Sequence, residues 1–210
     1  MKKLFISVLA AISLSLVIPG TGWAQYTGPP NVVGLFEFQD GAGATNTFDV
    51  GTPVTIYLVL IQPVDEQNGD TPYSTINAFE LMLNFNPPGN LFLLGAILPP
   101  GAGDNFEPTD ISAGFLEYIV GLASDFPVTD ETVVLITFTF MVSAPGNIEV
   151  TLGPTFDPII PGEMAFQSVP GELRVMYSIS GSHDAPVFWF GHGPDPVKNE
   201  TFGSFKALYH

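Results

Sequence analysis

The three histidines of the chain, His183, His192 and His210, all lie near its end. The first belongs to Ser182-His183-Asp184, which contains the three residue types of a hydrolytic relay. Neighbouring residues of an extended segment point to opposite sides, so these three cannot act on one another in series. No Gly-x-Ser-x-Gly nucleophile motif occurs in the chain. We therefore predict a polar loop here and a protein that is not an enzyme.

A metal ion is a second kind of chemistry for this region. His183, Asp184, His192 and Asp195 are all of residue types that ligate metal ions. They could converge on one metal ion, but nothing in the sequence fixes their mutual geometry.

The segment 65–70 places acidic and amide side chains around a glycine turn, and calcium prefers such oxygen ligands. It lacks the ligand spacing of an EF-hand. Two interpretations therefore stay open: a calcium site formed by Asp65, Glu66 and Asp70, or a solvated loop between strands. We predict no other cofactor.

A cluster of aromatic residues, Phe188-Trp189-Phe190, follows the last of the expected strands. Exposed aromatic rings form platforms for sugar rings, with nearby polar side chains that bond the hydroxyl groups. Buried aromatic rings instead close the end of a core. Trp189, Phe188 and Phe190 are therefore candidate ligand-binding residues, with core packing as the alternative.

The overall charge excludes several classes of partner. The 210 residues include 21 Asp and Glu but only 5 Lys and Arg, which gives a net charge of −16. Such a polyanion repels nucleic acids and anionic lipids. There is no cysteine, so neither a disulfide framework nor a thiolate metal site can form.

The first 24 residues have the three parts of a secretory signal peptide. Lys2 and Lys3 are followed by the apolar run 4–17 and by small residues at Gly22 and Ala24. This run is too short to span a bilayer stably. We expect cleavage, no membrane span in the mature chain, and a location in the medium, at the cell surface or in the periplasm.

Most of the remaining chain alternates apolar and polar residues with the period of two that is typical of strands. Turn residues such as Asn68-Gly69-Asp70 and Pro145-Gly146-Asn147 separate the runs. The run 54–61 is apolar on both faces, which predicts a central strand. The expected strands are 33–38, 54–61, 76–86, 91–98, 115–122, 132–143, 147–152 and 172–177.

Eight or nine short strands predict an all-β protein, a two-sheet antiparallel sandwich of residues 25–180. Residues 181–210 form a C-terminal extension rich in proline and glycine. We expect it to be a strap or a short helix, because Phe202, Phe205, Leu208 and Tyr209 fit one helix face.

Three passages, in order, resemble those of a cohesin module. They are the turn and strand 49–56, the strand 76–87 that ends in Phe85-Asn86-Pro87, and the strand 132–143 with its Pro145-Gly146 turn. The resemblance covers about residues 33–177. It implies a jelly-roll sandwich, the fold that related carbohydrate-binding modules share.

Cohesins hold dockerin-bearing proteins in assemblies at the bacterial surface, and their relatives bind polysaccharides. The resemblance therefore implies a non-catalytic module that binds a secreted or surface protein. A polysaccharide-binding module of the same fold is the alternative. The sequence identifies neither the individual partner nor the oligomeric state.

Overall fold

The computed structural model describes residues 28–43, 45–46, 48–103, 111–168 and 172–191. The predicted signal peptide and the predicted helix face around Phe202 lie outside these residues. In the described part, no helix is long and apolar enough to cross a membrane. Thirteen strands and two short 3-10 helices make up its regular structure. The strands are β1 (Val32–Phe36), β2 (Thr45–Asn46), β3 (Pro53–Ile61), β4 (Val64–Asp65), β5 (Thr71–Pro72), β6 (Thr75–Asn86), β7 (Leu91–Ile97), β8 (Phe115–Pro127), β9 (Thr132–Val142), β10 (Ile148–Gly153), β11 (Met164–Gln167), β12 (Leu173–Ser178) and β13 (Phe188–Phe190); the 3-10 helices are η1 (Glu66–Asn68) and η2 (Ile111–Ala113).

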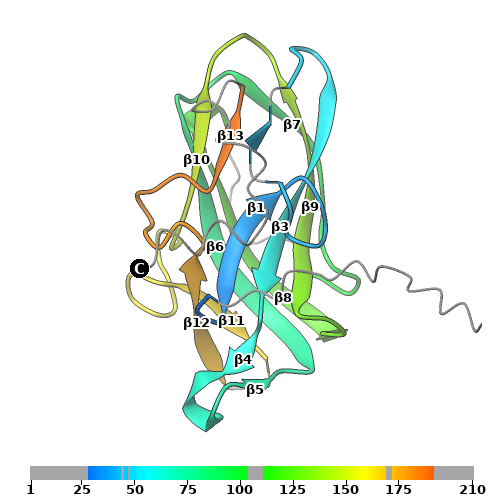
Figure 1. The fold of residues 1–210 in the computed structure, drawn as a ribbon, viewed down its shortest axis with the longest axis vertical. Helices are drawn as coiled ribbons and strands as arrows, with labels where there is room; N and C mark the ends of the chain where they lie inside the picture. Colours follow the sequence, from blue (N-terminus) through cyan, green and yellow to red (C-terminus); the bar gives the residue numbers. More distant parts are fainter. Residues whose placement is uncertain (1–27, 44, 47, 104–110, 169–171, 192–210) are drawn as a thin grey trace, which may run out of the picture.

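The strands form a sandwich of two layers (Figure 1). In the first layer, the order is β7-β9-β3-β1, and all three pairings are antiparallel. In the second layer, β6 is central and pairs with β8 along one edge and with β10 and β11 along the other. The chain of hydrogen-bonded strands passes between the layers where β1 pairs in parallel with β12.

Aromatic side chains from the facing strands hold the layers together. Phe140 on β9 contacts Phe85 on β6 with 5.9 Å between ring centroids, and Phe138 on β9 lies 5.7 Å from Tyr118 on β8. Both β9 rings are fully buried. Burial of one such side chain contributes roughly 1.5–3 kcal/mol, so this interior stabilises the fold without disulfides.

The long strand β6 divides one of its edges between two partners. Residues 78–80 pair with β11, whereas residues 82–86 pair with β10. The loop 154–163 connects these two partners. The loop begins where β10 stops pairing with β6 and ends where β11 starts to pair with it. Between these two points it lies over the outer face of the second layer, which is the face away from the core.

The predicted fold class, an all-β sandwich, is confirmed, and all eight expected strands are present. The central position of 54–61 is also confirmed, because β3 lies between β1 and β9. Two details differ from the expectation. The pairings β1–β12 and β13–β2 are parallel, and five short strands, β2, β4, β5, β11 and β13, had no predicted counterpart. Strands of two to four residues are too short for a clear alternation.

The predicted boundary between the sandwich and the C-terminal extension, at residue 180, differs from the observed end of the sandwich. Residues 188–190 form β13, which pairs with β10 and extends the second layer. The first part of the predicted C-terminal extension therefore belongs to the sandwich. Residues 192–210 lie outside the described part of the chain.

Candidate functional site

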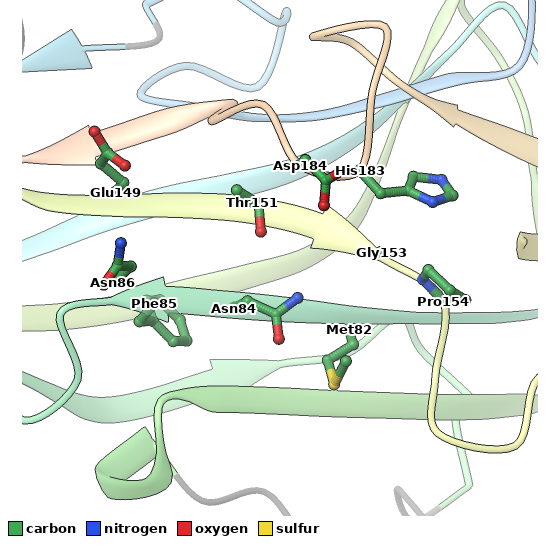
Figure 2. Close-up of a pocket in the computed structure, with 10 residues that line it drawn as sticks. All are labelled: Met82, Asn84, Phe85, Asn86, Glu149, Thr151, Gly153, Pro154, His183 and Asp184. Atoms are coloured by element: carbon green, nitrogen blue, oxygen red, sulfur yellow. The ribbon is translucent and has the colours of Figure 1, made fainter. Parts of the chain in front are cut away.

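The outer face of the second layer contains a hollow of about 480 Å³ (Figure 2). Strands β6 and β10 form its floor, and the loop before β13 reaches it with His183 and Asp184. Most of the side chains that line it are polar. The lining residues are Met82, Asn84, Phe85, Asn86, Glu149, Thr151, Gly153, Pro154, His183 and Asp184.

The antiparallel register between β6 and β10 explains this polar floor. Asn84 is paired with Thr151 and Asn86 with Glu149, and paired residues project from the same side of a sheet. The intervening pairs, such as Leu83 with Leu152, are fully buried in the core. The alternation of apolar and polar residues along β6 and β10 therefore places the apolar residues in the core and the polar residues in the hollow.

The Ser182-His183-Asp184 segment forms a tight turn at one side of the hollow. The Ser182 hydroxyl oxygen accepts a hydrogen bond of 3.1 Å from the backbone amide of Asp184. The Ser182 carbonyl oxygen accepts another from the Ser180 hydroxyl, at 2.8 Å. The Ser182 side chain thus stabilises its own turn. His192 and Asp195, the other members of the predicted metal group, lie outside the described residues.

The aromatic cluster is divided between the core and the outer face. Phe188 and Phe190 are fully buried, and the Phe190 ring packs 5.2 Å from Phe140. The idea that they belong to an exposed platform is therefore wrong, because alternation on a strand turns both inward. Trp189 is half-buried and paired with Glu149, so it lies on the outer face beside the hollow.

An apolar cluster lies farther along the same face, and we call it the shoulder: Phe115, Phe156 and Ile159. The rings of Phe115 and Phe156 meet edge to face at 5.1 Å. Phe156 is nevertheless 69% exposed and Ile159 is 61% exposed. Both belong to the loop 154–163, which presents them to solvent.

Two buried glutamates hold this loop in place. An oxygen of Glu117 on β8 accepts a hydrogen bond of 2.6 Å from the Phe156 amide. An oxygen of Glu80 on β6 accepts one of 2.7 Å from the Ile159 amide. Only 2% of Glu117 and 7% of Glu80 is exposed. Burying a carboxylate is energetically costly unless it accepts hydrogen bonds. If the loop moved away, both carboxylates would lose these bonds, so the bonds stabilise the observed position of the loop.

The surroundings of Glu80 raise its pKa. Desolvation is the largest cause, and the negative charges of Asp157 and Glu117 add to it. Hydrogen bonds from the amides of Ile159 and Ile160 act in the opposite direction but are weaker. Glu80 therefore retains its proton to a higher pH than a solvated glutamate does.

The proposed calcium ligands lie elsewhere, at the hairpin of β4 and β5. One Asp65 oxygen accepts bonds from the Gln67 amide at 3.1 Å and from the Arg174 guanidinium at 2.8 Å. Glu66 and Asp70 are exposed. The Arg174 cation therefore lies directly beside Asp65, and calcium binding by Asp65, Glu66 and Asp70 stays a prediction. Among the described residues, no three acidic or histidine side chains are placed to hold a metal ion.

Alternation along the expected strand 76–86 places Glu80, Asn84 and Asn86 on its polar side, but it does not connect them to the loop 154–163. A signal was present, because Glu80 and Glu117 are single acids among apolar neighbours. Which loop would cover them depends on the pairing of β6 with β10 and β11. The local sequence does not contain that information.

The described fold and face define a class, a two-layer β-sandwich with a polar hollow and an apolar shoulder on one face. No protein-family model and no curated protein matches the sequence. Similar solved structures are cohesin modules, the family whose motifs the sequence resembles. Each is a protein to which this chain is similar.

A type II cohesin domain from the cellulosome of Acetivibrio cellulolyticus is 12% identical, with a TM-score of 0.47, over 71% of this chain and 92% of its own. A cohesin module from a Clostridium perfringens family 33 glycoside hydrolase is 11% identical, with a TM-score of 0.42, over 70% and 90%. A non-cellulosomal cohesin from Archaeoglobus fulgidus is 10% identical, with a TM-score of 0.38, over 85% and 99%.

Proposed function

We propose that this chain is a non-catalytic module that binds another protein through the outer face of its second layer. The observation that supports the proposal most strongly is the shoulder. Phe156 and Ile159 are presented to solvent by a loop that two buried glutamates hold in one conformation. A surface ordered in advance loses little entropy on binding, so its apolar area contributes more fully to affinity.

The hollow beside the shoulder supplies the polar part of such an interface. Protein interfaces combine an apolar centre with a polar rim that forms hydrogen bonds. Glu149 and Asp184 in the hollow and Asp157 in the loop give this rim a negative charge. The partner that fits it has an apolar pocket bordered by lysine or arginine. The resemblance to cohesins seen in the sequence implies the same role, with a secreted or surface protein as the partner.

The location that we propose follows from the predicted signal peptide, residues 1–24. After its removal the module acts outside the cytoplasmic membrane, in the medium, at the cell surface or in the periplasm. Fractionation of the source cells, with the mass of the mature chain, tests this part. An intact N-terminus in the cytoplasm would contradict it.

The test of the binding surface compares two matched double variants as immobilised baits. Phe156→Ser with Ile159→Ser removes the shoulder, whereas Phe92→Ser with Ile97→Ser removes exposed apolar side chains from the other layer. A protein of the extracellular fraction should bind the wild type and the second variant but not the first. Calorimetry with that purified protein should then show at least about tenfold weaker binding to the shoulder variant, a loss of about 1.4 kcal/mol. Equal binding to both variants would contradict the proposal.

A polysaccharide is a second candidate ligand, favoured by one row of residues. Trp189, Glu149 and Asn86 lie next to one another across β13, β10 and β6 on the outer face. A tryptophan ring beside a carboxylate and an amide is an arrangement suited to a sugar. Affinity gels with neutral polysaccharides test this candidate. Retardation that Trp189→Ala abolishes and the shoulder variant retains would support it, and no retardation on any polysaccharide would exclude it.

A further inference from the structure

The outer face of the first layer contrasts with that of the second because its strands carry no charged residue. None of β3, β7 and β9 contains Asp, Glu, Lys or Arg, although the whole chain has 26 such residues, 21 acidic and 5 basic. The registers place three rows of residues on this face. We call these nine residues the charge-free face: Phe92, Met141 and Pro53; Gly95, Thr139 and Thr55; Ile97, Thr137 and Tyr57.

Much of this face is apolar and open to solvent. Ile97 is 70% exposed and Phe92 is 50% exposed, and Leu94, beside the irregular pairing of β7 with β9, is 51% exposed. All three lie on β7, which ends the order of strands in the first layer (Figure 1). Proteins usually protect such terminal strands with charged side chains, proline or bulges that discourage pairing. Strand β7, which is described over its whole length, has the bulge but contains neither a charged residue nor proline.

We infer that the charge-free face is an interface between two copies of this chain. The charge distribution favours a second copy as the occupant. Two chains of net charge −16 repel each other, and the second layer places Glu149, Asp157 and Asp184 on its outer face. When two copies meet through the charge-free face, β3, β7 and β9 bring no carboxylates close together. The face also lacks acidic side chains that would attract a basic partner.

The geometry of the face also suits a second copy. Three antiparallel strands form a broad surface, and two such sheets pack face to face at about 10 Å. A twofold axis through the face places equivalent residues opposite each other. Thr139 occupies the centre of the middle row, between Gly95 and Thr55, so it lies closest to such an axis. This interface is separate from the proposed binding surface, so a dimer would still present two shoulders.

Sedimentation equilibrium of the purified full chain tests the inference. We expect a monomer–dimer equilibrium that shifts toward the dimer as sodium chloride is added, because salt screens the repulsion between two polyanions. Ile97→Glu and, separately, Phe92→Glu should weaken the dimer by at least about tenfold. Ile159→Glu on the shoulder is the matched control and should leave the dimer unchanged. Circular dichroism establishes that each variant is folded.

Cross-linking gives a second measurement that does not depend on disrupting the face. The chain has no cysteine, so one introduced thiol reports a single position. Thr139→Cys should give a covalent dimer with a short bis-maleimide, whereas Thr151→Cys, in the hollow, should not. A chain that stays monomeric at high salt and high concentration would overturn the inference. So would a dimer that Ile97→Glu and Phe92→Glu leave intact, or one that cross-links through Thr151→Cys alone.

Discussion

The two outer faces of the sandwich are built from the same alternation but have opposite surfaces. On the second layer, the outward positions of β6 and β10 are Asn84, Asn86, Glu149 and Thr151, which line the hollow. On the first layer, the outward positions of β7 and β9 include Phe92, Ile97 and threonines. The core requires only that inward residues be apolar, so each outward face is free to acquire its own chemistry. The difference is consistent with our proposal that the two faces bind different partners.

A second difference concerns how each face is shaped. The first layer presents side chains directly from its strands. The second layer adds a loop, because β10 and β11 share one edge of β6 and the connection must cross the outer face. Glu80 and Glu117 hold that loop from beneath. The position of the shoulder depends on hydrogen bonds to these two carboxylates. The shape of the charge-free face depends only on the pairing of β9 with β3 and β7.

The substitution with the largest expected effect removes a core ring that packs between the two layers. Phe140 contacts rings on β6, β9 and β13, so Phe140→Ala should lower the free energy of unfolding by about 3–5 kcal/mol. Urea unfolding followed by tryptophan fluorescence measures it, since Trp189 lies on β13. A loss below about 1 kcal/mol would mean that the two layers are not coupled through this ring.

Glu117→Ala should affect the second face alone. It leaves the Phe156 amide without its carboxylate acceptor, which costs about 1–3 kcal/mol of loop stability. Hydrogen exchange should therefore become faster at Phe156 and Ile159, and binding of the partner should weaken. Glu149→Ala, a carboxylate of the hollow, is the control. Unchanged exchange in the loop would show that Glu117 does not hold it.

Salt should act on the two faces in opposite directions. Binding of a basic partner at the acidic second face should weaken several-fold as sodium chloride rises, because screening reduces the attraction. Association through the charge-free face should strengthen over the same range. Calorimetry and sedimentation measure the two effects. A shift in the same direction for both would remove the electrostatic distinction between the faces.

The smallest effect concerns pH and Glu80. The pKa of Glu80 is raised in the folded chain, so the folded state binds this proton more tightly than the unfolded state does. Its contribution to the free energy of unfolding should thus increase as pH falls through the raised pKa, reach its maximum below the ordinary value of 4.5, and disappear as pH rises again.

Glu80→Gln removes this titration while it retains an oxygen that accepts from Ile159. Urea unfolding of both proteins over a pH series measures the difference. The wild type should gain stability relative to the variant on acidification. A gain on raising the pH would mean that the hydrogen bonds to the loop outweigh the desolvation of Glu80.

Most strands could be predicted because their signal is local. In the run that became β9, alternation alone separates the buried Phe138 and Phe140 from Thr137 and Thr139. The strand β11 could not be predicted, because its four residues have meaning only beside β6 and β12. The aromatic cluster lies between these cases. Alternation predicts that Trp189 differs from its neighbours, but which side is buried depends on the pairing of β13 with β10.

The long strands, the turns between them, the charge of the chain and the inward side of each long strand follow from the amino-acid sequence alone. These properties depend on residues within a few positions of each other. The tertiary structure alone decided that the loop 154–163 lies over Glu80 and Glu117, that Trp189 meets Glu149, and that three uncharged strands lie side by side. Such contacts join distant residues through strand pairing, whose hydrogen bonds are made by backbone groups that are present at every position and so do not by themselves name the partner strand.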